Sequence, residues 1–316
     1  MKVGQKYPSK ILLFGEYSLL MGSEALGIPF RHLGAGLSLP SGRDQPGSAA
    51  EAGNSLLEKY YEDWLCLQDE LRAVLDLDSL LKDIHRGLFV ESDIPVKSGI
   101  GSSGAFCAAI YGTYARDPLF PVPRPDQGTL RSLRSAFILM ESWFHGRSSG
   151  FDPLLSYTGR PLRMQGSGAI EPITLDGEFS GGLHVFLADA GPKEETAELI
   201  RRTMKQFIHG NSGTGPAGDL ARLNNHCISS LLAGDKPAFT EAVKNLSGFQ
   251  LSNMPWLVPG KISKLWARGL EDDSFYIKLC GSGGGGFMLG LTGNPARAAE
   301  IFRSEGLDII KVELND

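Results

Sequence analysis

Apolar residues along the chain fall into short continuous runs and into longer stretches with helical spacing, separated by glycine-rich turns. A continuous run bounded by turn residues is typical of a buried strand, whereas apolar residues three and four positions apart are typical of one helix face. The predicted strands are 10–14, 87–92, 184–189, 275–280 and 287–292. The predicted helices are 54–74, 105–115, 129–144 and further segments within 191–207 and 217–247, with loops at 40–53 and 118–125.

The order of these elements indicates the fold class and the number of domains. Strands and helices follow one another without a regular strand–helix–strand alternation, which predicts an α+β protein. A chain of 316 residues is long enough for about two domains. We place the boundary before Gly181, where a loop-rich stretch gives way to a strand and then a helix. The predicted domains are therefore residues 1–180 and 181–316.

The charge balance argues against several classes of partner. The chain carries 31 basic and 36 acidic residues, a net charge of −5, without a block of like charge. A nucleic-acid interface or a polybasic membrane surface needs clustered lysine and arginine, so neither nucleic acid nor a membrane is expected as a partner. No apolar run approaches the roughly 18 residues of a transmembrane span, and the first residues lack the apolar core of a signal peptide. Four scattered cysteines fit reduced thiols, so we expect a cytoplasmic protein.

Glycine is enriched, with 40 residues in 316, well above the usual share of about 7%. The first dense cluster is Ser98–Gly104 (SGIGSSG), directly before a predicted helix of small residues. Glycine lets a ligand approach the backbone closely, and a helix N-terminus presents unpaired N–H groups with partial positive charge. Together these features predict a phosphate cradle. The alternative is a tight turn capped by Ser102 or Ser103.

Two glycine clusters also match the dinucleotide fingerprint G-x-G-x-x-G. In the first, Gly99, Gly101 and Gly104 fit the pattern, but Pro95 and Lys97 separate them from the preceding strand, whereas the fingerprint follows a strand directly. The second cluster, 281–286, is followed at once by a predicted strand, so no helix N-terminus would meet a pyrophosphate. A strand–loop–strand with four consecutive glycines instead predicts close approach of the backbone to a ligand or to another loop.

Two carboxylates are candidates for chemistry. Glu141 borders an apolar helical stripe that runs through Phe137 and Met140, where a carboxylate needs a metal or a cation as partner unless it reaches solvent. Asp152 precedes Pro153 in a glycine-containing loop, which fits either a helix N-cap or a general base.

Other polar residues carry weaker signals. Lys10 begins a predicted strand, where lysine is commonly solvated, and His145 is more typical of a structural histidine than of a ligand. The six histidines are scattered, so no histidine metal cluster is expected. The nucleophile elbow G-x-S-x-G is absent from the sequence.

Three stretches in order resemble the motifs of the GHMP kinase family. They are residues 8–17 (PSKILLFGEY), 95–105 (PVKSGIGSSGA) and 280–287 (CGSGGGGF), near the beginning, middle and end of the chain. The resemblance implies two domains, an N-terminal one like ribosomal protein S5 domain 2 and a C-terminal ferredoxin-like one, with the active site in the cleft between them. It also implies an ATP-dependent kinase acting on a small-molecule alcohol.

Within the family, residues 145–152 (HGRSSGFD) are similar to a stretch of mevalonate kinases, whose magnesium ligand and catalytic aspartate have the spacing of Glu141 and Asp152. Tyr17 departs from this group, which usually has histidine there; Gly-Glu-Tyr is familiar from phosphomevalonate kinases. We therefore predict phosphorylation of the 5-hydroxyl of mevalonate. The alternatives are phosphomevalonate or another metabolite of the family as substrate, a dinucleotide-dependent oxidoreductase, and a non-catalytic nucleotide-binding sensor.

The resemblance implies a role for each matching residue. Asp152 takes or orients the hydroxyl proton, Lys10 pairs with Asp152, and Glu141 holds Mg²⁺ with Ser102 or Ser103. The ATP-binding residues are Lys97, Ser98, Gly99, Ile100, Gly101, Ser102, Ser103 and Gly104. The residues on the substrate side are Glu16, Tyr17, His145, Ser149, Gly283 and Gly284. The oligomeric state is left open, with a homodimer as one candidate.

Overall fold

The structure is a computed structural model that describes residues 4–40, 47–96, 98–118, 125–175, 182–191, 196–207 and 215–313. The chain divides into two compact units, each built from separate stretches of sequence. Unit 1 consists of Met1–Lys10, Pro29–Val96 and Gly101–Arg160, and unit 2 of Ile11–Ile28, Lys97–Ile100 and Pro161–Asp316. The expected boundary before Gly181 divides the chain at a single point of the sequence, and it stays a prediction.

Unit 1 is rich in helices that pack beside a strand pair. Strands β1 (Lys6–Phe14) and β2 (Ala25–Ser38) each begin in one unit and end in the other, and in unit 1 β2 pairs antiparallel with β3 (Phe89–Ser92). The helices of this unit are α1 (Ser48–Asp63), α2 (Asp69–Val74), α3 (Leu77–His85), α4 (Ser102–Tyr114), α5 (Gln127–His145) and α6 (Phe151–Thr158), with the short 3-10 turn η2 (Leu65–Leu67).

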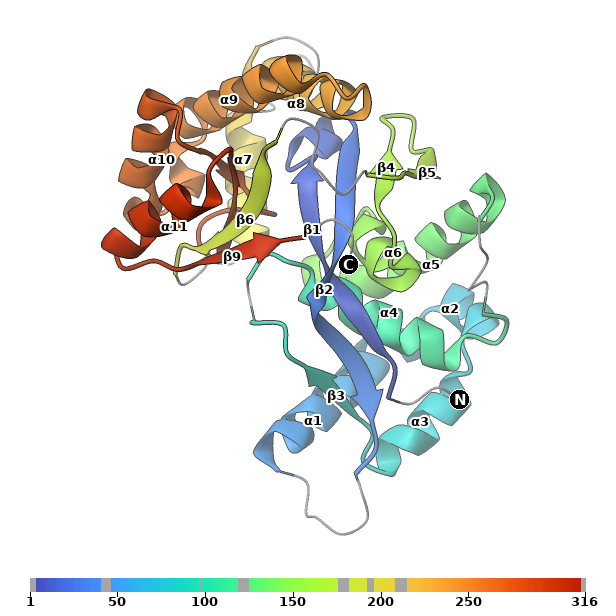
Figure 1. Cartoon of the computed structure of the whole chain (residues 1–316). Coiled ribbons are helices and arrows are strands. Elements are labelled where there is room, and N and C mark those ends of the chain that lie inside the picture. Colours follow the sequence, from blue (N-terminus) through green and yellow to red (C-terminus); the bar gives the residue numbers. More distant parts are fainter. Residues whose placement is uncertain are drawn as a thin grey trace. The chain divides into compact units, whose positions relative to one another are not determined.

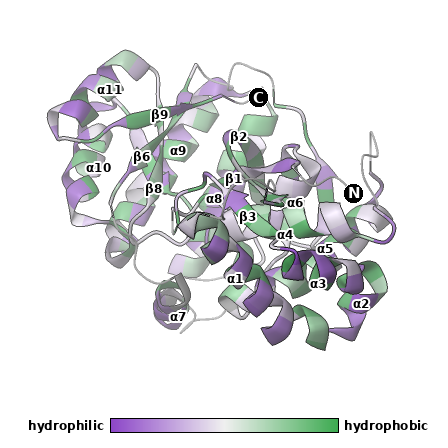
Figure 2. Cartoon of the chain, turned by 90° about the horizontal axis from the view of Figure 1, so that it is seen from below, coloured by the Kyte–Doolittle hydropathy of each residue, from purple (hydrophilic) through white to green (hydrophobic). Residues whose placement is uncertain are grey.

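The core of unit 1 forms where the apolar faces of these helices meet. The predicted stripe of α5 is confirmed, because Leu133, Phe137 and Met140 are fully buried. Rings from α1, α4, α5 and α6 make edge contacts, such as Tyr60 with Phe106 and Phe137 with its neighbours. Burial of each large side chain stabilises the fold by about 1.5–3 kcal/mol. In Figure 2, hydrophobic and hydrophilic residues alternate along surface helices such as α3.

Unit 2 contains a four-stranded antiparallel sheet in the order β7-β8-β6-β9, of which Figure 1 labels β6 and β9. Its strands are β6 (His184–Asp189), β7 (Tyr276–Leu279), β8 (Phe287–Thr292) and β9 (Ile309–Val312). Its helices are α7 (Thr196–Phe207), α8 (Pro216–Leu232), α9 (Lys236–Asn253), α10 (Gly260–Asp272) and α11 (Pro295–Ser304), with the 3-10 turns η1 (Ser18–Met21) and η3 (Pro255–Leu257). Helices between the first and second strands and between the third and fourth give the ferredoxin-like β-α-β-β-α-β order. The α+β expectation is confirmed.

Two further strands and a tight aromatic core complete unit 2. Strands β4 (Leu162–Met164) and β5 (Ile170–Pro172) extend the sheet from the first residues of β2. At the ferredoxin-like sheet, the rings of Phe186 and Phe302 lie 5.3 Å apart. Gly290 faces this cluster, and a Cβ there would come within 2.1 Å of the Phe186 ring. The core therefore needs glycine at this position of β8.

Some local expectations were wrong. The helix predicted over 54–74 is broken at Trp64, whose backbone leaves the helical region so that its indole N–H can donate to the Leu139 carbonyl at 2.8 Å. Residues 48–53, expected to be loop, belong to α1, and the long strand β2 was not predicted. Across the described ranges, none of the helices combines the length and the apolar character needed to cross a bilayer.

Candidate active site

A buried lysine and a partly exposed aspartate form the centre of the candidate site in unit 1. Lys10 lies in β1 with only 2% of its surface exposed, so the expectation of a solvated lysine was wrong. Its Nζ lies 2.9 Å from Oδ2 of Asp152. The Asp152 side chain keeps 30% of its surface exposed. One partner of this ion pair is therefore sealed in the core while the other can meet a ligand.

The start of α6 determines where Asp152 points. Gly150 is the N-cap with φ 69°, and Asp152 lies in the first turn, so the N-cap reading of Asp152 was wrong. A Cβ at Gly150 would come within 2.7 Å of the Arg134 carbonyl oxygen, which explains the need for glycine. The Asp152 carboxylate therefore lies at the N-terminus of α6, where the helix carries a partial positive charge.

Glu141 lies in α5 and is 4% exposed, so the reading in which it reaches solvent was wrong. Its carboxylate accepts hydrogen bonds from the hydroxyls of Ser103, at 2.9 Å, and Ser148. Burial and, next, the charge of Asp152 raise the pKa of Glu141 to about 7, although the two serines and Lys10 act in the opposite direction. A cation bound next to Glu141 would offset both the burial of its charge and the repulsion by Asp152, and so lower the pKa of Glu141.

The N-terminus of α4 approaches the same residues. Its N-cap is Gly101, with φ 84°, and no side chain caps the helix, so the reading of Ser102 or Ser103 as a cap was wrong. A Cβ at Gly101 would come within 2.7 Å of the Lys10 side chain, and one at Gly104 within 2.9 Å of the Asp152 backbone. The first N–H groups of a helix have no partner within it. Glycine thus brings these amides next to the Lys10–Asp152 pair.

The donor set of this site fits Mg²⁺. The ion prefers hard oxygen ligands and usually takes only one or two carboxylates from the protein, keeping several waters. Glu141 supplies a buried carboxylate, and the Ser103 hydroxyl is already bonded to it. Ser102 is exposed at the first position of α4. No group of three or more acidic, histidine or cysteine side chains gathers around a metal site within the described ranges.

In unit 2 the two glycine clusters meet. The N–H of Phe287 donates to the Ser98 carbonyl at 2.9 Å, and a Cβ at Gly281 would come within 2.9 Å of the Gly99 carbonyl oxygen. The run 281–286 joins β7 to β8, as predicted, and all five of its glycines have positive φ. Ser98 and Ile100 are buried, and within the described part of the chain the Ser98 hydroxyl has no hydrogen-bond partner.

A second buried ion pair lies in unit 2. Oε1 of Glu16, at the end of β1, is 2.6 Å from Nζ of Lys278 in β7, and both side chains are at most 2% exposed. Lys278 also donates to the Leu279 carbonyl at 2.6 Å. The carboxylate of Glu16 is therefore neutralised inside the core of unit 2.

Tyr17 follows Glu16 in an unusual conformation. Its φ of 58° is rare for a bulky residue and costs on the order of 1–3 kcal/mol. The side chain is 6% exposed, and its hydroxyl donates to the Ser282 carbonyl at 2.7 Å. Burial raises the pKa of this hydroxyl above its usual value. The neutral phenol is thus a permanent donor to the glycine run.

Comparisons with known proteins agree with these motifs. Residues 65–160 match the family described as GHMP kinases N terminal domain. The chain is 24% identical over 319 residues to a mevalonate kinase of Thermococcus sibiricus, covering 95% of this chain and 92% of the relative. It is 24% identical over 313 residues to a mevalonate kinase of Pyrococcus horikoshii, covering 93% and 89%. The chain is thus similar to GHMP kinases at residues 65–160 and to mevalonate kinases along most of its length.

A solved structure shows that the fold is shared with a mevalonate kinase along nearly the whole chain. A crystal structure of a mevalonate kinase superposes with a TM-score of 0.65 at 18% identity, covering 98% of this chain and 99% of that one. The family match itself includes Ser103, Glu141 and Asp152, whereas Lys10 and the run 281–286 lie outside the matched residues. The shared fold therefore extends well beyond the part in which the family match is found.

The remaining predicted site residues are placed as follows. Ser149 precedes α6, where its hydroxyl accepts from the Phe151 N–H at 3.3 Å. Gly283 and Gly284 pack against protein, since added Cβ atoms would come within 3.0 Å of Leu257 and 2.5 Å of Leu199. Lys97 lies outside the described residues, and so does the side chain of His145, the last residue of α5. The roles assigned to all these residues stay predictions.

Sequence reasoning missed two polar residues of this chain. Ser148, the second partner of Glu141, belongs to the stretch HGRSSGFD and could have been selected there as a hydroxyl near Asp152. Lys278 is a lone charge inside the apolar strand sequence FYIKLC. A charge in a buried strand needs a partner of opposite sign, which was a usable signal.

Proposed function

We propose that this chain is a GHMP kinase that transfers the terminal phosphoryl group of ATP to the 5-hydroxyl of mevalonate. The observation that carries the proposal is the Lys10–Asp152 pair at 2.9 Å, with the Asp152 carboxylate partly open to solvent beside the N-terminus of α4. The relatives named above are mevalonate kinases, and the similarity covers nearly their whole length. This supports the choice of mevalonate as substrate.

The residues of unit 1 divide the work of phosphoryl transfer. This reaction depends mainly on positioning and on stabilisation of negative charge. The first amides of α4, from Gly101 to Gly104, bind phosphate oxygens at the positive end of the helix. Asp152 accepts the proton of the substrate hydroxyl through its exposed side, while Lys10 holds the carboxylate in place.

Glu141 and Ser103 would hold Mg²⁺, which when bound neutralises charge on the ATP phosphates. In the absence of a cation, Ser103 and Ser148 orient the Glu141 carboxylate by donating to it. Both serines thus keep a buried acceptor in position for a hard cation.

Phosphomevalonate is the second candidate substrate, because of Tyr17. The hydroxyl of Tyr17 is engaged with the Ser282 carbonyl, so this chain differs on the substrate side from kinases that have histidine at the position. His145, Ser149, Gly283 and Gly284 remain the proposed residues of the substrate side. Glu16, sealed against Lys278, and Tyr17, bonded to Ser282, would act there only by holding the backbone in place.

A coupled ADP-release assay with Mg-ATP tests the proposal directly. Mevalonate, phosphomevalonate, homoserine and galactose are supplied separately to the purified protein. We expect turnover with mevalonate to exceed that with the other alcohols by at least about tenfold. Preferred turnover of phosphomevalonate would select the second candidate, and no turnover of any alcohol would remove the kinase proposal as stated.

The two other classes are less well supported by the geometry. In the dinucleotide fingerprint a strand leads directly into the glycines, but β3 ends at Ser92 and residues 93–101 precede α4. A nucleotide sensor without catalysis has no use for the Lys10–Asp152 pair beside Glu141. A homodimer and a cytoplasmic location stay predictions from the sequence.

A further inference from the structure

Tyr17 lies at the middle of a chain of polar contacts within unit 2. The indole N–H of Trp256 donates to Oγ1 of Thr203 at 3.0 Å. The Thr203 side chain interacts in turn with the Tyr17 hydroxyl, whose pKa burial raises and this contact lowers. The hydroxyl of Tyr17 donates to the Ser282 carbonyl at 2.7 Å. These contacts connect η3 and α7 to the glycine run.

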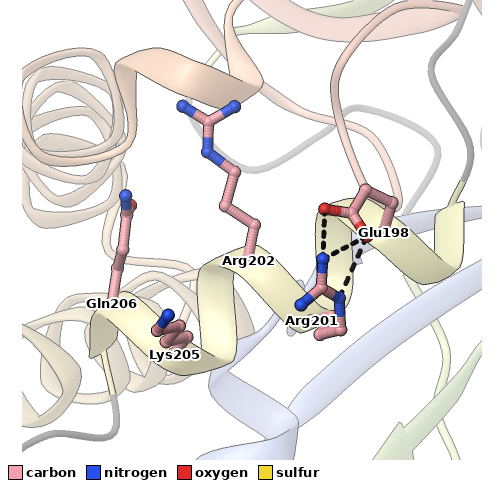
Figure 3. A pocket seen from close by; sticks show the side chains of 5 residues that line it. All are labelled: Glu198, Arg201, Arg202, Lys205 and Gln206. Atoms are coloured by element: carbon pink, nitrogen blue, oxygen red, sulfur yellow. Dashed lines mark hydrogen bonds and ion pairs between the residues drawn. The ribbon is translucent and has the colours of Figure 1, made fainter.

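Helix α7 takes part in this chain through one face only. Leu199 and Thr203, one helical turn apart, are both fully buried. The opposite face is polar and borders a surface cavity of about 450 Å³ (Figure 3), where Arg201 is paired with Glu198 at 2.7 Å. The buried face therefore fastens α7 to Tyr17, while the charged face is directed outward.

The glycine run is held at several points along its length. Beyond Ser282, the N–H of Gly284 donates to the Leu257 carbonyl at 2.8 Å and the N–H of Gly286 to the Gly191 carbonyl at 2.7 Å. Both bonds are made by backbone groups. The Tyr17 hydroxyl is a side-chain group that binds the run, and it follows directly on Glu16, which Lys278 anchors.

We propose that Tyr17 is a positioning residue that sets the conformation of residues 281–286 through Trp256, Thr203 and Ser282, rather than a residue that binds the substrate with its own hydroxyl. Its costly backbone conformation supports this role, because strain persists where the surrounding structure requires it. The functional part of the inference rests on the proposed kinase function, in which Gly283 and Gly284 belong to the substrate side.

Amide hydrogen exchange followed by mass spectrometry tests the structural part without any activity. Tyr17→Phe keeps the ring but removes the bond to Ser282. We expect the amides of Gly284, Gly286 and Phe287 to exchange about fivefold faster, the effect of losing one net hydrogen bond. Thr203→Val removes the hydroxyl that contacts Tyr17 and should speed exchange at the same amides. This variant also tests the proposal if Tyr17→Phe does not fold.

A matched control distinguishes the loss of this chain of contacts from the general effect of removing a tyrosine hydroxyl. Tyr276 lies in β7 of the same unit and donates to Asp273 at 3.0 Å, outside the chain. Tyr276→Phe should leave exchange at residues 284–287 within about twofold of the original protein. Unchanged exchange in both Tyr17→Phe and Thr203→Val would overturn the proposal.

Kinetics then test the link to substrate. If the run is correctly placed for a smaller fraction of the time, the apparent affinity falls by that fraction. Tyr17→Phe should therefore raise KM for the alcohol about fivefold and leave kcat within about twofold. A fall in kcat of more than tenfold with unchanged exchange would make Tyr17 a catalytic residue and overturn the proposal. If the original protein turns over no alcohol, the proposed function fails, while the exchange result still decides whether Tyr17 positions the run.

Discussion

The two buried lysine–carboxylate pairs of this chain use the same chemistry for different ends. In unit 1, Lys10 meets Asp152 at 2.9 Å, and the aspartate side chain is 30% exposed. In unit 2, Lys278 meets Glu16 at 2.6 Å, with both side chains at most 2% exposed. The exposed carboxylate can act on a ligand, whereas the sealed one can only join strands. Exposure, and not the ion pair itself, distinguishes the candidate catalytic pair from the structural one.

The largest effect should come from Asp152→Asn. We expect kcat to fall by about a thousandfold, because the amide cannot accept the hydroxyl proton. The coupled ADP-release assay measures turnover, and binding of a fluorescent ATP analogue reports whether the nucleotide site is intact. Asp219→Asn, at an exposed ion pair, is the matched control and should retain turnover. Unchanged turnover in Asp152→Asn would remove this residue from the reaction.

The sealed pair should matter for stability instead. Lys278→Met leaves the Glu16 charge buried without its partner, so we expect the free energy of unfolding in urea to fall by about 3–5 kcal/mol. The double variant with Glu16→Leu should regain much of that loss. Arg222→Ala, which breaks an exposed pair with Asp219, should change stability by less than about 1 kcal/mol. Equal losses in Lys278→Met and Arg222→Ala would contradict the distinction between sealed and exposed pairs.

The raised pKa of Glu141 predicts a pH dependence of stability in the absence of Mg²⁺. Its pKa is about 7 in the folded protein against an ordinary value of 4.5, so the folded state binds more protons than the unfolded state between these values. The free energy of unfolding should therefore fall as pH rises from about 4.5 to about 7, by ~3 kcal/mol at most. Urea titrations across this interval measure the slope.

Glu141→Gln should remove this part of the slope, because the amide does not titrate. Glu198→Gln, at an exposed glutamate of α7, should leave the slope unchanged. Added Mg²⁺ should flatten the slope in the original protein, and Glu141→Gln should raise the Mg²⁺ concentration needed for turnover. The same slope in both Glu141→Gln and the original protein would show that other groups cause it.

The smallest effect should separate the two serines of α4. Ser103→Ala removes the bond to Glu141, and we expect turnover at limiting Mg²⁺ to fall about tenfold, as for a hydrogen bond to a charged group. Ser102→Ala should change turnover by less than about twofold, since Ser102 is exposed. The reverse order would assign the metal to Ser102.

Much of the fold could be predicted from local patterns. The strands at 184–189 and 287–292 have the expected bounds, because continuous apolar runs ended by turn residues leave few alternatives. Strand β2 was missed because glycines and Pro29 interrupt its pattern. The glycines are required by the neighbouring backbone, since a Cβ at Gly34 would come within 2.6 Å of the Tyr7 carbonyl oxygen. Such a contact is absent from any local pattern.

The sequence could predict which residues belong to the site, but not which of them contact one another. The motifs selected Lys10, Ser103, Glu141 and Asp152, all of which lie together in unit 1. Their spacing along the chain could not show that Ser103 and not Ser102 bonds to Glu141, because one residue along a helix turns the side chain by about 100°. Nor could it show that Tyr17 binds the carbonyl of a residue 265 positions away.

The sequence by itself determined the resemblance to GHMP kinases, the α+β class and the residue types available for chemistry, because these follow from motifs and from the periodicity of apolar residues. Tertiary structure alone decided which carboxylate is sealed and which is open, and which hydroxyl serves which acceptor. These properties depend on burial and direction, which arise when distant segments pack together. Lys10 and Lys278 both lie in apolar strand sequences, and only packing made one the partner of Asp152 and the other the partner of Glu16.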